Sequence, residues 1–197
     1  MTFEELLAEV YTLTNRPDLE AETKAAIKAA TLKAHQSDFY SKDISEALIN
    51  LGNTDAYIWS FDVITHISNF RAIKYIRKYD SNTSEPGDFI SIILPEQVLD
   101  SYKVTREDVA YVAGRNIEIR SSTAFSKMIF ACYVNPIVTN SGYSSWVADL
   151  YPYVIVYEAA RVVFKTIGYD EQSAQYEKLV GEQFMHLKLN AITDVGY

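Results

Sequence analysis

The chain has 197 residues, 48% of them hydrophobic, which excludes a disordered protein and is sufficient for one folded domain with a real core. The formal charge of -8 argues against a protein whose main task is to grip phosphate backbones, because that affinity comes from Lys and Arg. The single cysteine, Cys132, excludes an internal disulfide framework, and within the apolar stretch FACYV it is expected to be a buried thiol.

Two helices are predicted at the start of the chain. Thr2 and Glu5 match a capping box, in which each side chain satisfies an amide at a helix start, so a helix is expected over 2–14. The acidic start lacks the basic region of a secretory signal. After a proline-containing break, Asp18 is expected to cap a second amphipathic helix that continues over 19–37.

The middle of the chain is rich in β-branched and aromatic residues separated by turn formers. This pattern predicts about five short strands, mostly antiparallel. A polar loop over 81–88 predicts a hairpin with an exposed tip, and PEQVLDSY at 95–102 suggests a helical turn.

The densest basic cluster lies in FRAIKYIRKYD and is a candidate nucleic-acid site. Strand alternation places its four cations on two different faces, so they form no flat basic platform. We interpret this segment instead as a solvated edge strand that lysines protect from unwanted pairing. The four cations are Arg71, Lys74, Arg77 and Lys78.

The stretch YPYVIVYEAARVVFKTIG at 151–168 predicts a central apolar helix. Glu158, Arg161 and Lys165 share one narrow stripe of it, and three charges in so short a segment exclude a membrane span. Such a helix must be covered on most sides, so we expect its own chain to cover one side and a neighbouring subunit to cover the charged stripe. A charge reversal at Arg161 is then expected to impair assembly more than folding. The residues expected inside the subunit are Val154, Ala159 and Val162.

A final helix is predicted over 171–190, with Asp170 as its cap. Its buried face is expected to comprise Tyr176, Val180, Phe184, Leu187 and Ala191. The predicted fold class is therefore α+β, a helical bundle of two N-terminal and two C-terminal helices with a small, mostly antiparallel β region inserted between them. One domain is expected over 1–197, made of N-terminal helices (1–40), the β-rich insertion (41–143), C-terminal helices (144–190) and a tail (191–197).

No catalytic motif is found in the sequence. His35, His66 and His186 lie far apart, and none belongs to a metal-binding pair such as HExxH. There is also no GxSxG, Walker or GxGxxG motif. We therefore expect no catalytic residue, no cofactor and no metal.

The order of helices, β region, long apolar helix and long polar helix resembles the head-to-tail adaptor (connector) proteins of short-tailed bacteriophages. The resemblance runs nearly end to end and is one of sequence texture, without an invariant chemical motif. The segments that carry it are TLTNRPDLEAETKAAIKAATLKAHQSDFY, FRAIKYIRKYD, ILPEQVLDSY, DVAYVAGRNIEIRSS and SSWVADLYPYVIVYEAARVVFKTIGYDEQSAQYEKLVGEQ.

The resemblance implies a non-enzymatic virion protein in the neck between capsid and tail, made in the host cytoplasm. The subunit is expected to form a homo-oligomeric ring of about twelve copies that docks under the portal protein, contacts tail nozzle or fibre proteins, and passes DNA through its channel during ejection, with no membrane partner. The residues expected at the portal are Ile192, Val195 and Tyr197. Those expected between subunits are Glu158, Arg161 and Lys165, and those in a tail-side loop are Ser81, Glu85 and Asp88.

Two other function classes stay open. A tail terminator or other neck or tail protein is the nearest alternative, although a sequence dominated by strands is more typical of it. A small α+β enzyme or ligand-binding domain would need a convergent polar pocket. A DNA-binding regulator is the least favoured, because of the acidic balance.

Overall fold

The computed structural model describes residues 1–80, 85–99, 102–139 and 142–193. The chain divides into two compact units. A helical unit combines residues 1–43 with 135–197, and a β unit comprises residues 44–134.

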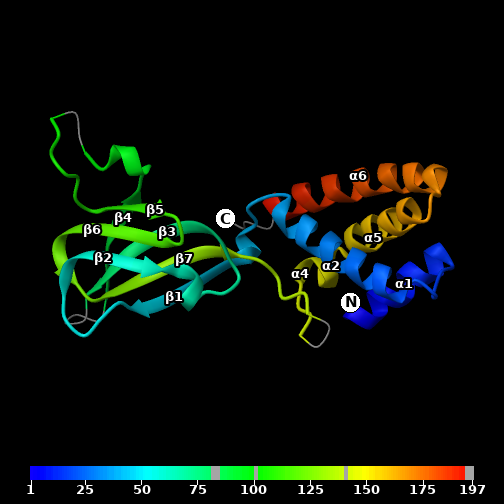
Figure 1. The fold of residues 1–197 in the computed structure, drawn as a ribbon, viewed down its shortest axis with the longest axis horizontal. Coiled ribbons are helices and arrows are strands. Elements are labelled where there is room, and N and C mark those ends of the chain that lie inside the picture. The colour runs from blue at the N-terminus through cyan, green and yellow to red at the C-terminus, as the bar shows by residue number, and fades with distance from the viewer. Residues whose placement is uncertain (81–84, 100–101, 140–141, 194–197) are drawn as a thin grey trace. The chain divides into compact units, whose positions relative to one another are not determined.

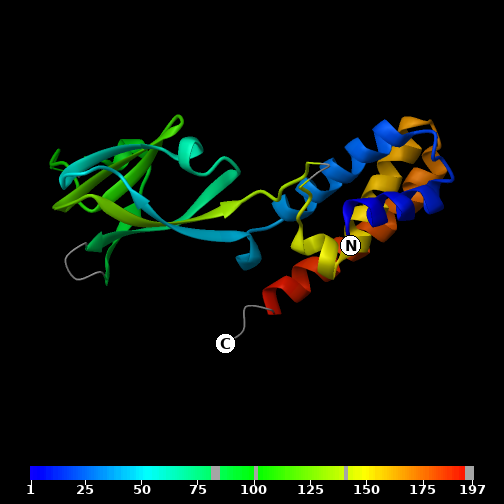
Figure 2. The same ribbon diagram turned by 90° about the horizontal axis from the view of Figure 1, so that it is seen from below.

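The helical unit is built around one central helix. Helix α5 (Pro152–Thr166) contacts α1 (Phe3–Thr14), α2 (Glu20–Gln36), α4 (Trp146–Leu150) and α6 (Asp170–Thr193). Figure 1 shows α2, α5 and α6 side by side, and Figure 2 shows the same arrangement from below. Val154 and Ala159 of α5 are fully buried, as predicted. No helix in the described part of the chain is both long and apolar enough to cross a bilayer.

The predicted cap of the first helix is confirmed, and the predicted cap of the second helix is wrong. The capping box of α1 is present, since Glu5 N donates to Thr2 Oγ1 at 3.2 Å and Thr2 N donates to Glu5 Oε2 at 2.8 Å. Asp18 does not cap α2. Its carboxylate is instead held by Arg16, whose Nη2 lies 2.7 Å from it, and Leu19 occupies the cap position without a side-chain hydrogen bond.

The β unit is one seven-stranded mixed sheet in the order β1-β7-β3-β4-β5-β6-β2. The pairings are antiparallel except for β4 with β5, which is parallel. The sheet curls on itself (Figure 2). The strands are β1 (Ile44–Asn50), β2 (Ala56–Asp62), β3 (Phe70–Asp80), β4 (Glu85–Ile92), β5 (Val109–Ala113), β6 (Asn116–Phe125) and β7 (Lys127–Val134). The short elements are η1 (Ser41–Asp43), α3 (Val63–His66) and η2 (Pro95–Gln97).

The expectation of a helical bundle with only a small inserted β region is therefore wrong. The chain is α+β, but the sheet has a hydrophobic core of its own, centred on Ile76, Ile117 and Phe130, each at most 1% exposed. Cys132 is buried in this core, where desolvation raises the pKa of its thiol. Two features account for the extra strands. Strand β1 was not predicted, and the segment VAYVAGRNIEIRSS forms two strands, β5 and β6.

The interpretation of FRAIKYIRKYD as an edge strand is also wrong. It forms β3, which lies between β7 and β4 in the middle of the sheet. Lys78 is only 7% exposed there, so this lysine serves the interior of the unit and does not protect an edge.

Candidate interaction surfaces

An arm of residues 93–108 connects β4 to β5 and stands away from the sheet (Figure 1). Near its start lies η2, whose turn is closed by a hydrogen bond from Gln97 N to Leu94 O at 2.9 Å and capped by one from Leu94 N to Gln97 Oε1 at 3.1 Å. Further out, Leu99 pairs with Thr105 in an isolated antiparallel bridge, and Arg106 N donates to Val98 O at 2.8 Å. The two sides of the arm are thus paired with each other.

The base of the arm is fixed to the sheet by Asp108. Its carboxylate accepts hydrogen bonds from Lys78 Nζ at 2.9 Å and from the hydroxyl of Ser122 at 2.6 Å. The hydroxyl of Ser121 and the backbone amide of Ser122 each donate to it at 3.1 Å. Partial burial acts to raise the pKa of Asp108, but the hydrogen bonds from Ser122 and Lys78 outweigh it and hold this pKa well below its ordinary value. The arm therefore leaves the sheet from a rigid charged anchor.

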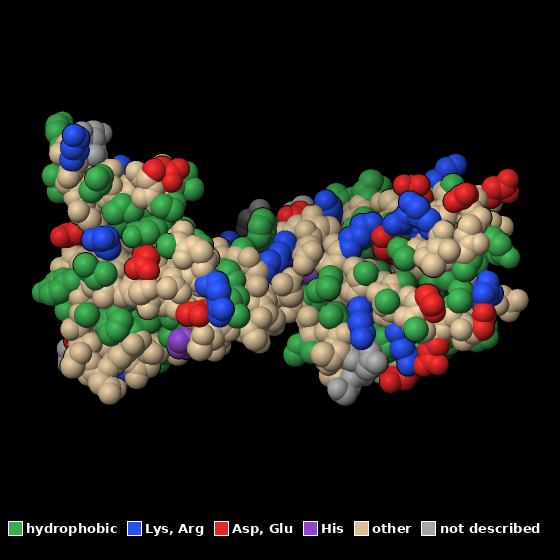
Figure 3. Space-filling model, viewed as in Figure 1, with side chains coloured by type: hydrophobic (Ala, Val, Ile, Leu, Met, Phe, Trp, Pro, Cys, Tyr) green, Lys and Arg blue, Asp and Glu red, His purple; other side chains and the backbone are tan. Residues whose placement is uncertain are grey.

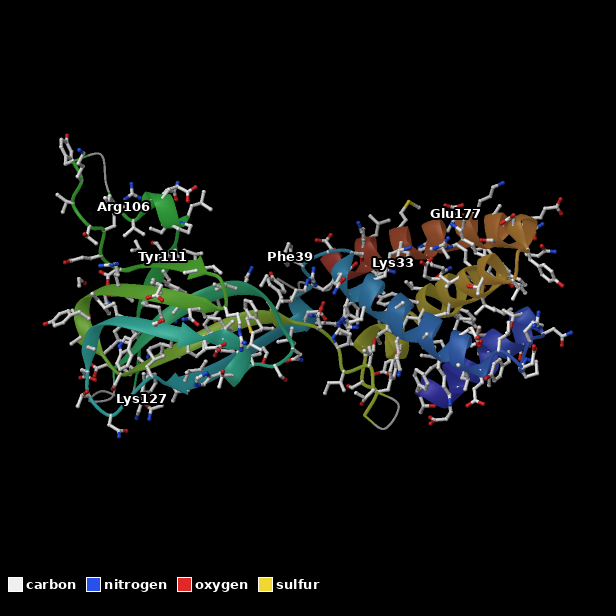
Figure 4. All side chains as sticks on the ribbon, viewed as in Figure 1. Lys33, Phe39, Arg106, Tyr111, Lys127 and Glu177 are labelled. Carbon is white, nitrogen blue, oxygen red and sulfur yellow. The ribbon has the colours of Figure 1, made fainter. Side chains whose placement is uncertain are left out.

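The arm exposes large apolar side chains. Tyr102 is 87% exposed, and three aliphatic neighbours are more than half exposed, namely Leu94, Leu99 and Val104. Figure 3 shows hydrophobic side chains beside Lys and Arg on the projecting arm, and Figure 4 labels Arg106 there. An apolar surface on an anchored projection is typical of a protein-binding element.

The anchor at Asp108 makes the stability of the β unit sensitive to acid. The pKa of Asp108 is lower in the folded chain than in the unfolded chain, so its contribution is fully present above about pH 4 and is lost as the pH falls further, toward the folded pKa. We expect the free energy of unfolding to decline less between about pH 5 and pH 3 in Asp108→Asn than in the unaltered chain. Urea titrations at each pH measure this, with Asp88→Asn, at an exposed position on β4, as the matched control. Equal acid sensitivity in both variants would count against the anchor.

The helical unit contains a buried charge cluster at α5. Glu158 is 4% exposed and accepts hydrogen bonds from Lys33 Nζ of α2 at 2.6 Å and from Arg161 Nε and Nη2, both at 2.9 Å. Desolvation acts to raise the pKa of Glu158, but the hydrogen bonds from Arg161 and Lys33 lower it overall. The hydrogen bonds to Glu158 are the main cause that raises the pKa of Arg161, and the charge of Glu177 on α6 adds to this effect. Figure 4 labels Lys33 and Glu177 on the helices concerned.

The residues expected between subunits thus differ in their surroundings. Glu158 and Arg161 are brought together within one chain, whereas Lys165 of the same helix is exposed. A role of this set in contacts between subunits stays a prediction, for which Lys165 is the accessible member.

The remaining predicted site residues are those of the tail-side loop and those of the portal contact. Glu85 and Asp88 are exposed, but they belong to strand β4 and not to a loop. Ser81 lies outside the described residues, as do Val195 and Tyr197. The backbone of Ile192 lies in the last turn of α6. The portal and tail-side roles of these residues stay predictions.

A hydrogen-bonded chain of His35, Asp43 and Ser145 lies inside the helical unit. His35 Nδ1 lies 2.7 Å from Asp43 Oδ1, and His35 Nε2 lies 2.9 Å from Ser145 Oγ. Trp146 Nε1 also donates to Asp43 Oδ1, at 2.7 Å. The connectivity is that of a Ser-His-Asp triad, yet Ser145 is 5% exposed and its hydroxyl oxygen caps α4 by accepting from Ala148 N at 3.2 Å. A nucleophile has to reach a substrate, so we interpret this chain of groups as structural.

We expect Ser145→Ala to lower the stability of the helical unit by about 2 kcal/mol, because it removes a helix cap and a partner of a buried imidazole. Chemical denaturation followed by helical circular dichroism measures this. Ser144→Ala, one residue earlier, is the matched control and should have a much smaller effect. Unchanged stability of Ser145→Ala together with loss of an ester-hydrolysing activity would show instead that the triad is catalytic.

Two observations bear on ligand binding. In the β unit a surface hollow of about 340 Å³ is lined by Lys78 together with Asp55, Asp80 and Asp88. The ammonium of Lys78 is held by Asp108 and by Thr123 Oγ1, at 2.9 and 3.0 Å. Across the described ranges, no three His, Cys, Asp or Glu side chains are grouped so that they could hold a metal ion.

The arm was missed in the sequence because its composition does not differ from that of a strand and a turn. ILPEQVL and YKVTR contain the apolar and β-branched residues of buried strands, and the exposure of these residues depends on distant partners. The one available signal is the clustering of Pro95 and charged residues among the apolar ones. Lys33, the partner of Glu158, was also missed, because it lies 125 positions earlier in the chain and no local pattern connects the two residues.

No family model matches the sequence, and no curated protein matches it significantly.

Proposed function

We propose that the chain is a structural virion protein, a head-to-tail adaptor subunit that forms a ring beneath the portal and joins the capsid to the tail. The observation that carries the proposal is the arm, an anchored projection that exposes Leu94, Leu99, Tyr102 and Val104. Such side chains are costly to leave in water, so their arrangement favours a protein that works by binding other proteins.

The helical unit supports the same proposal. Its central helix α5 is covered by helices of its own chain, so this unit does not need a neighbour in order to fold. Subunits of a ring that assembles late must be stable before they dock, and here the surface that remains for docking is made of exposed side chains such as Leu150, Met185 and Leu189. The resemblance to adaptor proteins of short-tailed phages supplies the expected partners, which are the portal and the tail proteins.

The proposal accounts for the acidic charge as well. The helical unit contains 15 Asp and Glu against 9 Lys and Arg, so most of the excess negative charge lies there. A negative channel wall repels DNA and does not retain it during ejection. The DNA is therefore a passenger and not a ligand in this proposal.

Sedimentation tests the proposal directly. The purified chain is run alone and after mixing with rings of the portal protein encoded in the same genome. We expect slow sedimentation of the chain alone and co-sedimentation with the portal rings, with several chains bound per ring. Failure of the two proteins to co-sediment at micromolar concentrations would overturn the proposed function.

A further inference from the structure

Strand β1 is an edge of the sheet that lacks the usual protection. Its register with β7 runs unbroken from Ile44 to Asn50, without the irregularity that the other edge strand, β2, shows near Ala56. Natural edge strands are protected by lysines, prolines or bulges. Residues 44–70 contain no Lys, Arg or Pro. Strand β1 is therefore a ready template for an additional strand.

The outward-facing backbone groups of β1 follow from its hydrogen bonds. Leu51 N donates to Ser126 O at 2.8 Å, directly beyond the paired residues Asn50 and Lys127. Hydrogen-bonded and non-hydrogen-bonded pairs alternate along an antiparallel ladder. The N–H and C=O groups of Asn50, Leu48 and Glu46 therefore point away from β7, toward the open edge.

The arm offers a matching edge. Because Arg106 N donates to Val98 O beside the Leu99 and Thr105 bridge, the N–H and C=O of Thr105 point away from Leu99. Thr105 is exposed, and the cations Lys103 and Arg106 flank it within two residues. The chain turns at Lys103, which has a φ of 63°, so the segment available for pairing is Val104–Arg106.

We infer that, in the ring of the proposed function, Thr105 of one copy pairs with the edge of β1 in the next copy, opposite Glu46. This inference rests on the proposed function for the ring itself. Charge complementarity supports it, because residues 44–70 contain Glu46, Asp55 and Asp62 but no cation, whereas Lys103 and Arg106 flank the paired Thr105. The Glu46 carboxylate accepts from the hydroxyl of Tyr75 and has further acceptor sites for a cation.

The charges disfavour one alternative pairing register. An antiparallel pairing of Thr105 with Glu46 places Arg106 opposite Ser45 and Glu107 opposite Ile44. Shifting Thr105 to Leu48 would place Glu107 opposite Glu46, and like charges directly opposite each other are destabilising.

One chain does not make this contact with itself. Strands β7 and β3 lie between β1 and β4, from which the arm departs. Each copy therefore offers the arm to one neighbour and β1 to the other. Such a head-to-tail contact is the kind from which rings are built, when the rotation between successive copies closes.

Disulfide trapping tests the inference. Directly opposed residues of a hydrogen-bonded pair have Cα atoms about 5.5 Å apart, within the range that a disulfide spans. The chain carrying Glu46→Cys and Thr105→Cys is mixed with portal rings, oxidised mildly and examined on a non-reducing gel. We expect a ladder of covalent multimers. An equal mixture of the two single variants should give dimers and no ladder, because each copy then carries half of the pair. The native Cys132 is fully buried.

The mismatched pair Glu46→Cys with Val112→Cys is the control, since Val112 is exposed on β5 and outside the arm. A comparable ladder from this pair would mean random collision and would overturn the inference. Portal-bound rings that give no ladder with the Glu46 and Thr105 pair would overturn the inference and leave the proposed function standing. A ladder without portal binding would support the inference and overturn the proposed function. If the chain gives no ladder and does not bind portal rings, both the inference and the proposed function are overturned.

Discussion

Replacing Arg161 by Glu is expected to destabilise the helical unit by about 3–5 kcal/mol, enough to unfold it or to lower its unfolding midpoint greatly. The carboxylate of Glu158 is 4% exposed and depends on Arg161 for two of its hydrogen bonds. The reversal would leave this buried charge facing another carboxylate, with Lys33 alone to compensate. This expectation differs from the one drawn from the sequence, in which the reversal chiefly impairs assembly.

Urea denaturation followed by helical circular dichroism measures the effect. Lys165→Glu is the matched control, because it makes the same charge change on the same helix at an exposed position and should shift stability by no more than about 0.5 kcal/mol. If Arg161→Glu folds as stably as Lys165→Glu but fails to assemble, the charged stripe acts between subunits, as the sequence suggested.

The second large effect is expected from the arm. Changing Leu94, Leu99, Tyr102 and Val104 together to Ser should weaken ring assembly by about tenfold or more, since large apolar side chains dominate protein interfaces. All four are more than half exposed, so the stability of the isolated chain should change by about 1 kcal/mol or less. Binding to portal rings measures the first effect and thermal unfolding measures the second.

A quadruple variant that binds portal rings as well as the unaltered chain would show that the arm is not an assembly element. The same substitutions at Leu150 and Met185, exposed on the helical unit, give a comparison of that unit's surface with the arm.

The helices were largely predictable because their signals are local. The capping box at Thr2 and the apolar spacing of α6 each depend on residues within a few turns, and Val180, Leu187 and Ala191 are buried as the spacing predicted. The failure of Asp18 as a cap has an equally local cause, since Arg16 takes its carboxylate in a two-residue ion pair.

The sheet was not predictable in the same way, because strand pairing depends on distant partners. Strand β1 reads ISEALIN, whose Glu, Ala and Leu are helix formers, and only its pairing with β7, more than 70 positions later, makes it a strand. The central place of β3 likewise follows from its pairing with both β7 and β4. The lysines of β3 suggested an edge strand because their partners cannot be seen in the local sequence. In the structure, Lys78 is paired with Asp108 inside the unit.

The candidate site shows the same limit. Nothing in the local sequence distinguishes a Leu99 that is exposed on an arm from one buried in a core, because exposure is decided by the fold around it. The charged anchor at Asp108 joins residues from β3, the arm and β6, which no spacing rule brings together.

The most direct test of the proposed adaptor function is electron cryomicroscopy of complete particles assembled from the genome that encodes this chain, with the helical and β units fitted separately into the density. We expect a closed ring immediately beneath the portal that both units fit, with the apolar arm in contact with protein. The adaptor function would be contradicted if neither unit fits the density of the neck and the particles lack this chain.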